Sequence, residues 1–223
     1  MIKAILLDLD DTIFDWKKCA HMAIKKAAEE LELKLPDTVY ESFDKINPKL
    51  WGDYENKQIT LEEMIDKRFN IVFEEANFSF NGNLFEKHFK ENFLKNVFLI
   101  DDAYETLEYL YSKYDVYAAS NATLYQQQRR LSEAKIMDFF NDIFISEEIG
   151  SHKPHKEFYD GCMARMHYQK DEIIVIGDSL YSDITGAYNY GLKSIWFNRR
   201  NKEAKEKNFD YEISSLKELR NIL

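Results

Sequence analysis

From about residue 100 onward, short apolar runs alternate with stretches of helical spacing, and this alternation constrains the fold more than any other feature of the sequence. Strands that alternate with helices of this length form a parallel sheet, because each connecting helix packs back onto one of its faces. The predicted class is therefore α/β, a parallel sheet with helices on both faces. We expect strands at 116–120, 142–146, 172–178 and 193–197, and helices at 102–113, 122–135, 156–168 and 180–190.

The N-terminal segment 2–7 is nearly continuously apolar, which suits a strand covered on both faces of the same sheet but also a buried helical turn. Residues 15–98 contain no convincing strand. Apolar residues recur there at the spacing of one helix face, and another helix is expected at 61–76. The sequence therefore predicts an α/β core domain of residues 1–14 and 99–223, interrupted by an all-helical insert of residues 15–98.

Three aspartates, Asp8, Asp10 and Asp11, directly follow the N-terminal apolar run. Aspartate is common at turns and helix N-caps, so the three could simply end a strand. However, three carboxylates this close repel one another, and one would be enough to turn the chain. Carboxylates that lie this close are usually held by a cation, so the cluster also predicts a metal site.

Polar residues also follow the other expected strands. Ser120 and Asn121 end one strand, Asp178 ends another, and Lys153 lies in the loop after a third. Each residue alone has an ordinary explanation as a turn, a cap or a solvated charge. Ligands of open α/β sheets bind beyond the carboxyl ends of the strands, so the joint pattern indicates a ligand site at this edge.

These segments resemble, in order, the four motifs of the haloacid dehalogenase superfamily of phosphohydrolases: "DLDDT", "AASN", "HKP" and "GDSLYSD". The segments "TIFDW", "INPKLWGDYENKQIT" and "ISEEIG" are most similar to the pyrimidine-preferring nucleoside-monophosphate phosphatases, or 5'-nucleotidases. The resemblance spans essentially the whole chain. It implies a Rossmann-like parallel core with an inserted helical cap, and the activity of a phosphomonoesterase.

The resemblance implies a role for each motif residue. Asp8 would attack phosphorus to give an aspartyl-phosphate, and Asp10 would protonate the leaving alkoxide and then deprotonate the attacking water. Ser120 and Lys153 would bind the phosphoryl oxygens. Thr12 and Asn121 are candidate substrate-binding residues beside them.

The cofactor implied is Mg²⁺, which prefers oxygen ligands. The carboxylates of Asp8 and Asp178 and the backbone carbonyl of Asp10 would hold it, with Asp183 as a further or alternative ligand. Trp51 and Tyr54 are the candidate substrate-binding residues of the cap. Aromatic residues at such spacing more often belong to a core, but the matching segment of the resembled subfamily lies near the substrate.

Alternative functions remain open at this point. A sugar phosphate or another small phosphomonoester could be the substrate, and a 2-haloacid dehalogenase would use the same nucleophile. A dehalogenase needs no acid for its leaving group, so the carboxylate at position 10 favours a phosphatase. A phospho-accepting module without turnover also gathers acids and a lysine at strand ends, but the insert and Asp10 argue against it.

The chain of 223 residues carries a formal charge of −10, which argues against a nucleic-acid polymer as partner. A small phosphorylated substrate is expected instead. No apolar run approaches the ~18 residues of a membrane span, so we expect a cytoplasmic protein, as a monomer or homodimer. Cys19 and Cys162 indicate neither a disulfide nor a zinc site, and a zinc role is not favoured for His152 and His155.

Overall fold

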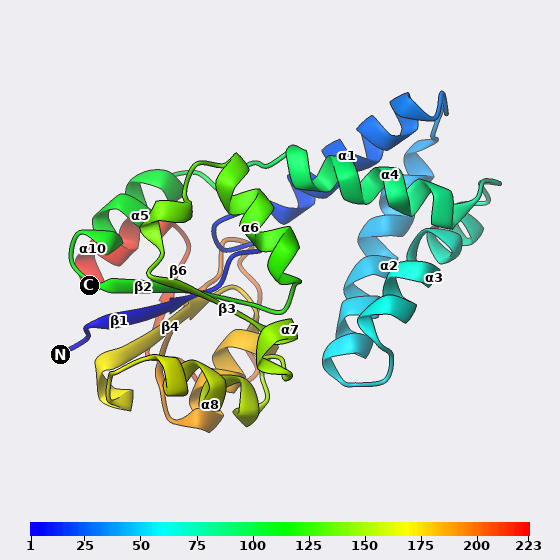
Figure 1. Ribbon diagram of the computed structural model, residues 1–223. Helices are drawn as coiled ribbons and strands as arrows, with labels where there is room; N and C mark the ends of the chain where they lie inside the picture. Colours follow the sequence, from blue (N-terminus) through cyan, green and yellow to red (C-terminus); the bar gives the residue numbers. More distant parts are fainter. The chain divides into compact units, whose positions relative to one another are not determined.

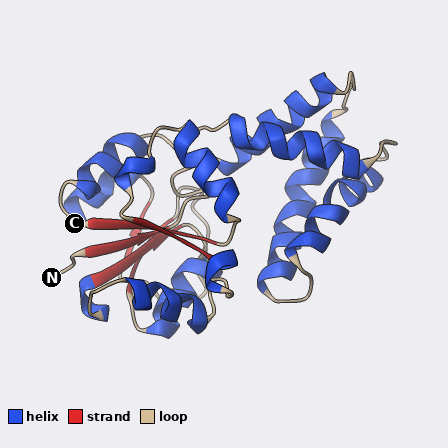
Figure 2. Cartoon of the chain, viewed as in Figure 1, coloured by secondary structure: helices blue, strands red, loops and turns tan.

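Short aliphatic runs such as "AILL" and "IIVIG" form the strands of one six-stranded sheet in the computed structural model, which describes residues 1–223. Every neighbouring pair of strands is parallel, and the order is β3-β2-β1-β4-β5-β6. The predicted parallel α/β sheet is confirmed (Figure 2). The strands are β1 (Ala4–Leu7), β2 (Asp115–Ser120), β3 (Asp142–Ile145), β4 (Ile173–Gly177), β5 (Lys193–Phe197) and β6 (Tyr211–Ile213).

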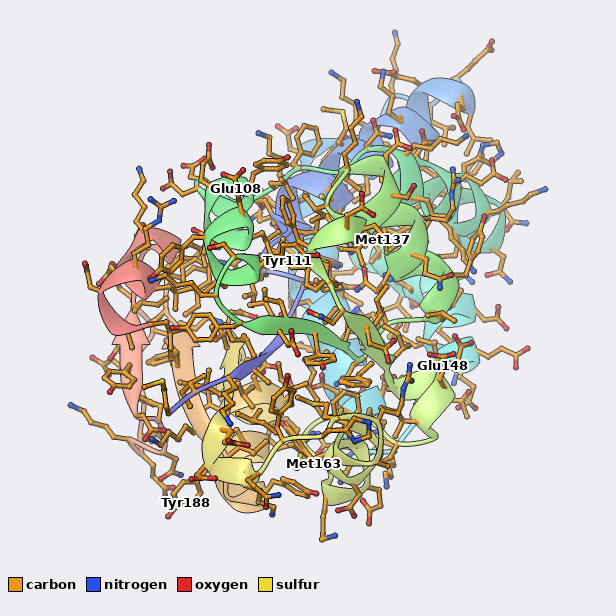
Figure 3. All side chains as sticks on the ribbon, turned by 60° about the vertical axis from the view of Figure 1, so that its left-hand side comes forward. Glu108, Tyr111, Met137, Glu148, Met163 and Tyr188 are labelled. Carbon is orange, nitrogen blue, oxygen red and sulfur yellow. The ribbon has the colours of Figure 1, made fainter.

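Helices cover both faces of this sheet. In Figure 1, α5, α6 and α10 lie on one side of the strands and α8 lies on the other. Figure 3 shows the same arrangement, with Tyr111 and Met137 on the first side and Met163 and Tyr188 on the second. The helices that belong with the sheet are α5 (Ala103–Tyr111), α6 (Leu124–Glu133), α7 (Ser146–Ile149), α8 (Lys156–Arg165), α9 (Gly186–Tyr190) and α10 (Leu219–Ile222). Shorter helical turns lie at Met137–Phe139, Lys170–Glu172 and Leu216–Glu218.

The core between the sheet and α8 is apolar and buried. Leu6 of β1, Phe144 of β3 and Val175 of β4 are buried against Phe158 and Cys162 of α8. Residues buried on both faces explain why the strands are continuously apolar rather than alternating. Each Å² of apolar surface that is buried contributes about 25 cal/mol to the free energy of folding. This burial holds the strands in place, and with them the residues that follow each strand.

Register places the ends of the central strands side by side. Leu7, the last residue of β1, lies opposite Ala118 of β2 and Ile176 of β4. The segments that follow Leu7, Ser120 and Gly177 therefore leave the sheet at the same edge. The order of the strands also reverses at β1, which is where ligands bind in sheets of this type.

Contacts within the chain divide it into two units, Met1–Asp15 with Phe98–Leu223 and Trp16–Val97. The second unit is entirely helical, with α1 (Trp16–Glu30), α2 (Asp37–Glu55), α3 (Leu61–Glu75) and α4 (Gly82–Lys95). Phenylalanines from three helices meet in its core, where the Phe69 ring lies 5.5 Å from Phe43 and 4.7 Å from Phe85. None of the helices in either unit is both long and apolar enough to span a membrane.

The bounds of helix α2, the short helices α7 and α10, and strand β6 were not predicted from the sequence. Helix α2 contains Pro48, a residue that interrupts helical hydrogen bonding, and its apolar positions are spread thinly among polar ones. Strand β6 has only three residues, two of them exposed, so it carries almost no apolar signal. The expected helix at 180–190 begins as a π-helical segment, Leu180–Thr185, and continues as α9.

A buried ion pair joins three helices of the second unit. Arg68 of α3 donates two hydrogen bonds to the Glu86 carboxylate of α4, at 2.9 and 2.5 Å, and one to Asn47 of α2. Its guanidinium also lies 4.9 Å from the centre of the Phe89 ring. Both side chains of the pair are less than one tenth exposed.

We expect Arg68→Met to lower the free energy of unfolding by about 3–5 kcal/mol, because it leaves the Glu86 charge buried and unpaired. Replacing both partners, as Arg68→Met with Glu86→Leu, should recover much of this loss. Lys45→Met, which breaks the exposed pair with Glu75 in the same unit, is the control and should change stability by less than about 1 kcal/mol. Urea unfolding at pH 8 followed by circular dichroism measures all of these. A loss for Arg68→Met as small as the control's would contradict a buried pair.

Candidate active site

The segment after β1 makes a tight turn that presents its aspartates at the edge of the sheet. The backbone oxygen of Leu9 accepts hydrogen bonds from Ile13 and Phe14, and Leu9 itself is fully buried. Asp11 takes up a left-handed backbone conformation, with φ of 64°. The buried Leu9 anchors the turn, so the flanking carboxylates of Asp8 and Asp10 are held at fixed positions.

Lys153 contacts residues from three of the predicted motifs. Its ammonium group donates to Asp8 Oδ1, to Asp183 Oδ1 and to the backbone oxygen of Ala119, each at 2.7 Å. Its side chain is 4% exposed. Burial acts to lower the pKa of Lys153, but the carboxylates of Asp183 and Asp8 outweigh it and raise the pKa above its usual range. The lysine is therefore a permanent cation within the cluster.

Asp8 is buried and held from two sides. One oxygen accepts from Lys153, and the other accepts from the Thr12 hydroxyl at 2.9 Å. Burial raises the pKa of Asp8 well above its usual range; Lys153 opposes this shift, and the charges of Asp183 and Asp178 add to it. A second cation beside Asp8 would favour the ionised form that a nucleophile requires.

Asp183 is held next to Asp8 by the segment after β4. Its Oδ2 accepts from the backbone N–H of Ser179 at 3.1 Å. Gly177 leaves the room for this carboxylate, since a Cβ at position 177 would lie 2.3 Å from the Asp183 carboxyl carbon. A side chain at position 177 would therefore displace the Asp183 carboxylate.

Three carboxylates form a cluster that suits a divalent cation. One oxygen from each of Asp8, Asp178 and Asp183 lies within 4.8 Å of the others. Burial raises the pKa of Asp178 to about 7, and the charges of Asp183 and Asp11 contribute. An all-oxygen donor set in which acids outnumber the buried basic groups fits Mg²⁺, so these residues are compatible with the predicted metal.

Asn121 and Ser120 lie at the end of β2. The Asn121 amide exchanges two hydrogen bonds with the backbone of Lys153, at 2.8 and 3.0 Å, so it positions the loop that carries the lysine. The Ser120 hydroxyl accepts from the backbone N–H of Ala122 and from the Gln127 amide. Trp51 and Tyr54 lie on α2 of the second unit, where their rings are in edge contact at 5.7 Å. Their role in substrate binding stays a prediction.

Several residues at this edge were not predicted from the sequence. Gln127 and Arg130 of α6 donate to the two carboxylate oxygens of Asp10, at 2.7 and 2.5 Å. Arg199 and Arg200, which follow β5, both donate to Asp11. No motif of the sequence singles these side chains out, because a charged or polar residue in a loop or helix is usually solvated. The cation that balances Asp11 is thus arginine.

Comparisons with known proteins agree with this site. Residues 5–197 match the family of haloacid dehalogenase-like hydrolases. The chain is 31% identical to the HAD-hydrolase YfnB of Bacillus subtilis, over 99% of this chain and 95% of YfnB. A magnesium-bound crystal structure of YfnB has a TM-score of 0.92, with 30% identity over 99% of this chain and 98% of that chain.

Two further relatives carry named activities. The pyrimidine 5'-nucleotidase PynA of Streptococcus pneumoniae is 28% identical over 99% of this chain and 94% of PynA. A glyceraldehyde 3-phosphate phosphatase of Pyrococcus furiosus is 29% identical over 100% of this chain and 93% of that protein.

The chain therefore belongs to the haloacid dehalogenase-like hydrolases, as the four motifs predict. It is an enzyme of the class that hydrolyses phosphoric monoesters.

We expect Mg²⁺ to raise the melting temperature of chelator-treated protein, because a cation that binds only the folded cluster stabilises it by mass action. Asp178→Ala should reduce this increase severalfold. The metal-free variant should melt no lower than the metal-free parent, since it has lost one of several repelling carboxylates. Asp171→Ala, at an exposed site of the same unit, is the control. A full Mg²⁺ response in Asp178→Ala would exclude Asp178 as a ligand.

Proposed function

We propose that the chain is a magnesium-dependent phosphomonoesterase that acts through an aspartyl-phosphate at Asp8. The observation that carries the proposal is the convergence of Asp8, Lys153 and Asp183, in which one buried ammonium group binds both carboxylates at 2.7 Å. A carboxylate that is held by a lysine and has a second acid two residues further on, at Asp10, is equipped for covalent phosphoryl transfer.

In the first step, a carboxylate oxygen of Asp8 attacks phosphorus while the bond to the ester oxygen breaks. Asp10 gives its proton to the leaving alkoxide. Ser120 binds a phosphoryl oxygen, and Lys153, whose three hydrogens are donated to protein oxygens without substrate, exchanges one of these bonds for a phosphoryl oxygen, whose charge is spread in the transition state. The Thr12 hydroxyl keeps the second oxygen of Asp8 in place, which orients the first oxygen for attack.

In the second step, water is the nucleophile. Asp10, now ionised, takes a proton from the water as its oxygen attacks phosphorus, and the bond from phosphorus to Asp8 breaks. Inorganic phosphate leaves and Asp10 is protonated again for the next substrate. Dividing one displacement into two lets the same residue serve as acid and then as base.

Asp8, Asp178 and Asp183, with the backbone carbonyl of Asp10, are the residues that would hold Mg²⁺. When bound, the ion supplies positive charge to the phosphoryl oxygens and offsets the repulsion between them and the acidic cluster. Lys153 alone balances only one of the three negative charges.

For the substrate we favour a nucleoside 5'-monophosphate or a similar small phosphomonoester. Support comes from the "INPKLWGDYENKQIT" segment and from the relative PynA, which is named as a pyrimidine 5'-nucleotidase. A base could stack on the ring of Trp51 or Tyr54. The second candidate is a sugar phosphate, since the Pyrococcus relative is named as a glyceraldehyde 3-phosphate phosphatase.

Asp8→Asn should fold normally and lose turnover by several orders of magnitude, because an amide of nearly equal volume is a poor nucleophile. Release of phosphate from p-nitrophenyl phosphate, with Mg²⁺ and with EDTA, measures this loss. Activity above about a tenth of the parent's would exclude Asp8 as the nucleophile. Full activity of the parent in EDTA would instead exclude the metal.

Trp51→Ala should lower kcat/KM for dUMP or dTMP by about tenfold to a hundredfold, since stacking on an aromatic ring contributes ~1–3 kcal/mol per base. Hydrolysis of p-nitrophenyl phosphate, which has no nucleobase, should be nearly unaffected. The ratio of the two rates is the measurement. Equal losses on both substrates would assign Trp51 to the packing of its helix, and a panel of sugar phosphates would then identify the substrate class.

A further inference from the structure

The polar run Gln126–Arg130 of α6 has two very different sides. Gln128 and Arg129 are exposed, whereas Gln127 and Arg130 have no exposed surface at all. Residues three apart lie on the same side of a helix, so the two buried side chains form one pair. Burying a charged and an amide side chain is unfavourable unless both make good hydrogen bonds, so their partners indicate what the pair does.

Gln127 connects two residues of the candidate active site. Its amide nitrogen donates one hydrogen to Asp10 Oδ2, at 2.7 Å, and the other to the Ser120 hydroxyl, at 2.8 Å. Its amide oxygen accepts from Arg130 at 3.3 Å, which fixes which end of the amide faces Asp10. A single side chain thus ties the serine at the end of β2 to the second aspartate after β1.

Arg130 holds the other oxygen of Asp10. Its Nη1 donates to Asp10 Oδ1 at 2.5 Å, and its guanidinium lies 4.2 Å from the centre of the Phe14 ring. Phe14 belongs to the same turn as Asp10 and is fully buried. Because each carboxylate oxygen has its own donor, the plane of the Asp10 carboxylate is set by α6 rather than by the turn that carries it.

We propose that Gln127 and Arg130 are positioning residues that orient the Asp10 carboxylate for its two proton transfers. The inference rests on the proposed function, in which Asp10 is the acid and then the base. Proton transfer requires the carboxylate to lie within hydrogen-bond reach of the leaving oxygen and later of the water. Because Gln127 donates to both Asp10 and Ser120, it also fixes the position of the Asp10 carboxylate relative to the phosphoryl group that Ser120 is proposed to bind.

A double-mutant cycle measured on kcat distinguishes a role of Gln127 and Arg130 in positioning Asp10 from a role in the packing of α6. Arg130→Met and Gln127→Met should each lower kcat for p-nitrophenyl phosphate by about 10- to 100-fold, as expected for misplacement of a catalytic group by about 1 Å. In the Asp10→Asn background, Arg130→Met should lower kcat by less than about threefold, because the group that it orients is already inactive. Gln127→Met should lose less there than in the parent, and the loss that remains is the part due to its bond with Ser120. Arg130→Lys should recover part of the activity that Arg130→Met loses.

Gln128→Met, at the exposed neighbouring position, is the matched control and should leave kcat unchanged. Circular dichroism melts confirm that each variant is folded, and Gln127→Met serves as the second probe if Arg130→Met does not fold. Equal losses in the Asp10 and Asp10→Asn backgrounds would overturn the inference and leave the proposed function standing. If Asp10→Asn itself has unchanged kcat, the role of Asp10 in the proposed function fails, and the inference fails with it.

Discussion

Three carboxylates follow a buried strand within four positions, and the rest of this edge of the sheet is arranged to balance their charge. Asp8 is paired with Lys153, Asp10 with Arg130, and Asp11 with Arg199 and Arg200. Without these pairs, the turn after β1 would hold three negative charges close together, at a place where burial already disfavours an ionised carboxylate. Each aspartate thus depends on a basic side chain from elsewhere in the chain.

The cations come from three separate connections of the sheet. Lys153 lies in the loop between β3 and α8, Arg130 on α6, and Arg199 and Arg200 after β5. The parallel topology makes this possible, because every strand that ends at this edge delivers its following segment to the same place. Sequence separations of more than 100 residues are therefore bridged by single hydrogen bonds, as between Arg130 and Asp10.

The sequence predicts the site residues whose place follows from the parallel topology and misses those whose place depends on how a helix packs. Residues placed directly after strands, such as Asp8 and Asp178, could be located because any parallel sheet brings such positions to one edge. Gln127 and Arg130 could not, because "QQQRR" on a helix has the composition of a solvated face, and only the packing of α6 decides which side is buried. The short strand β6 was missed for the same reason, since its place is set by β5 rather than by its own three residues.

The pairing also separates two kinds of aspartate. Asp10 and Asp11 each have arginine partners within hydrogen-bond distance, so the negative charge that each carries when ionised is balanced by the protein itself. Asp8 and Asp183 share one lysine at such a distance, Lys153, and the basic group paired with Asp178 is the half-exposed Lys202 at 3.6 Å. Acids thus outnumber buried basic groups in this cluster, and burial raises the pKa of both Asp8 and Asp178, so a divalent cation would favour their ionised forms. The acids that have arginine partners are thus Asp10, proposed to transfer protons, and Asp11 of the turn, whereas the acids of the cluster without such partners are the ones suited to bind Mg²⁺.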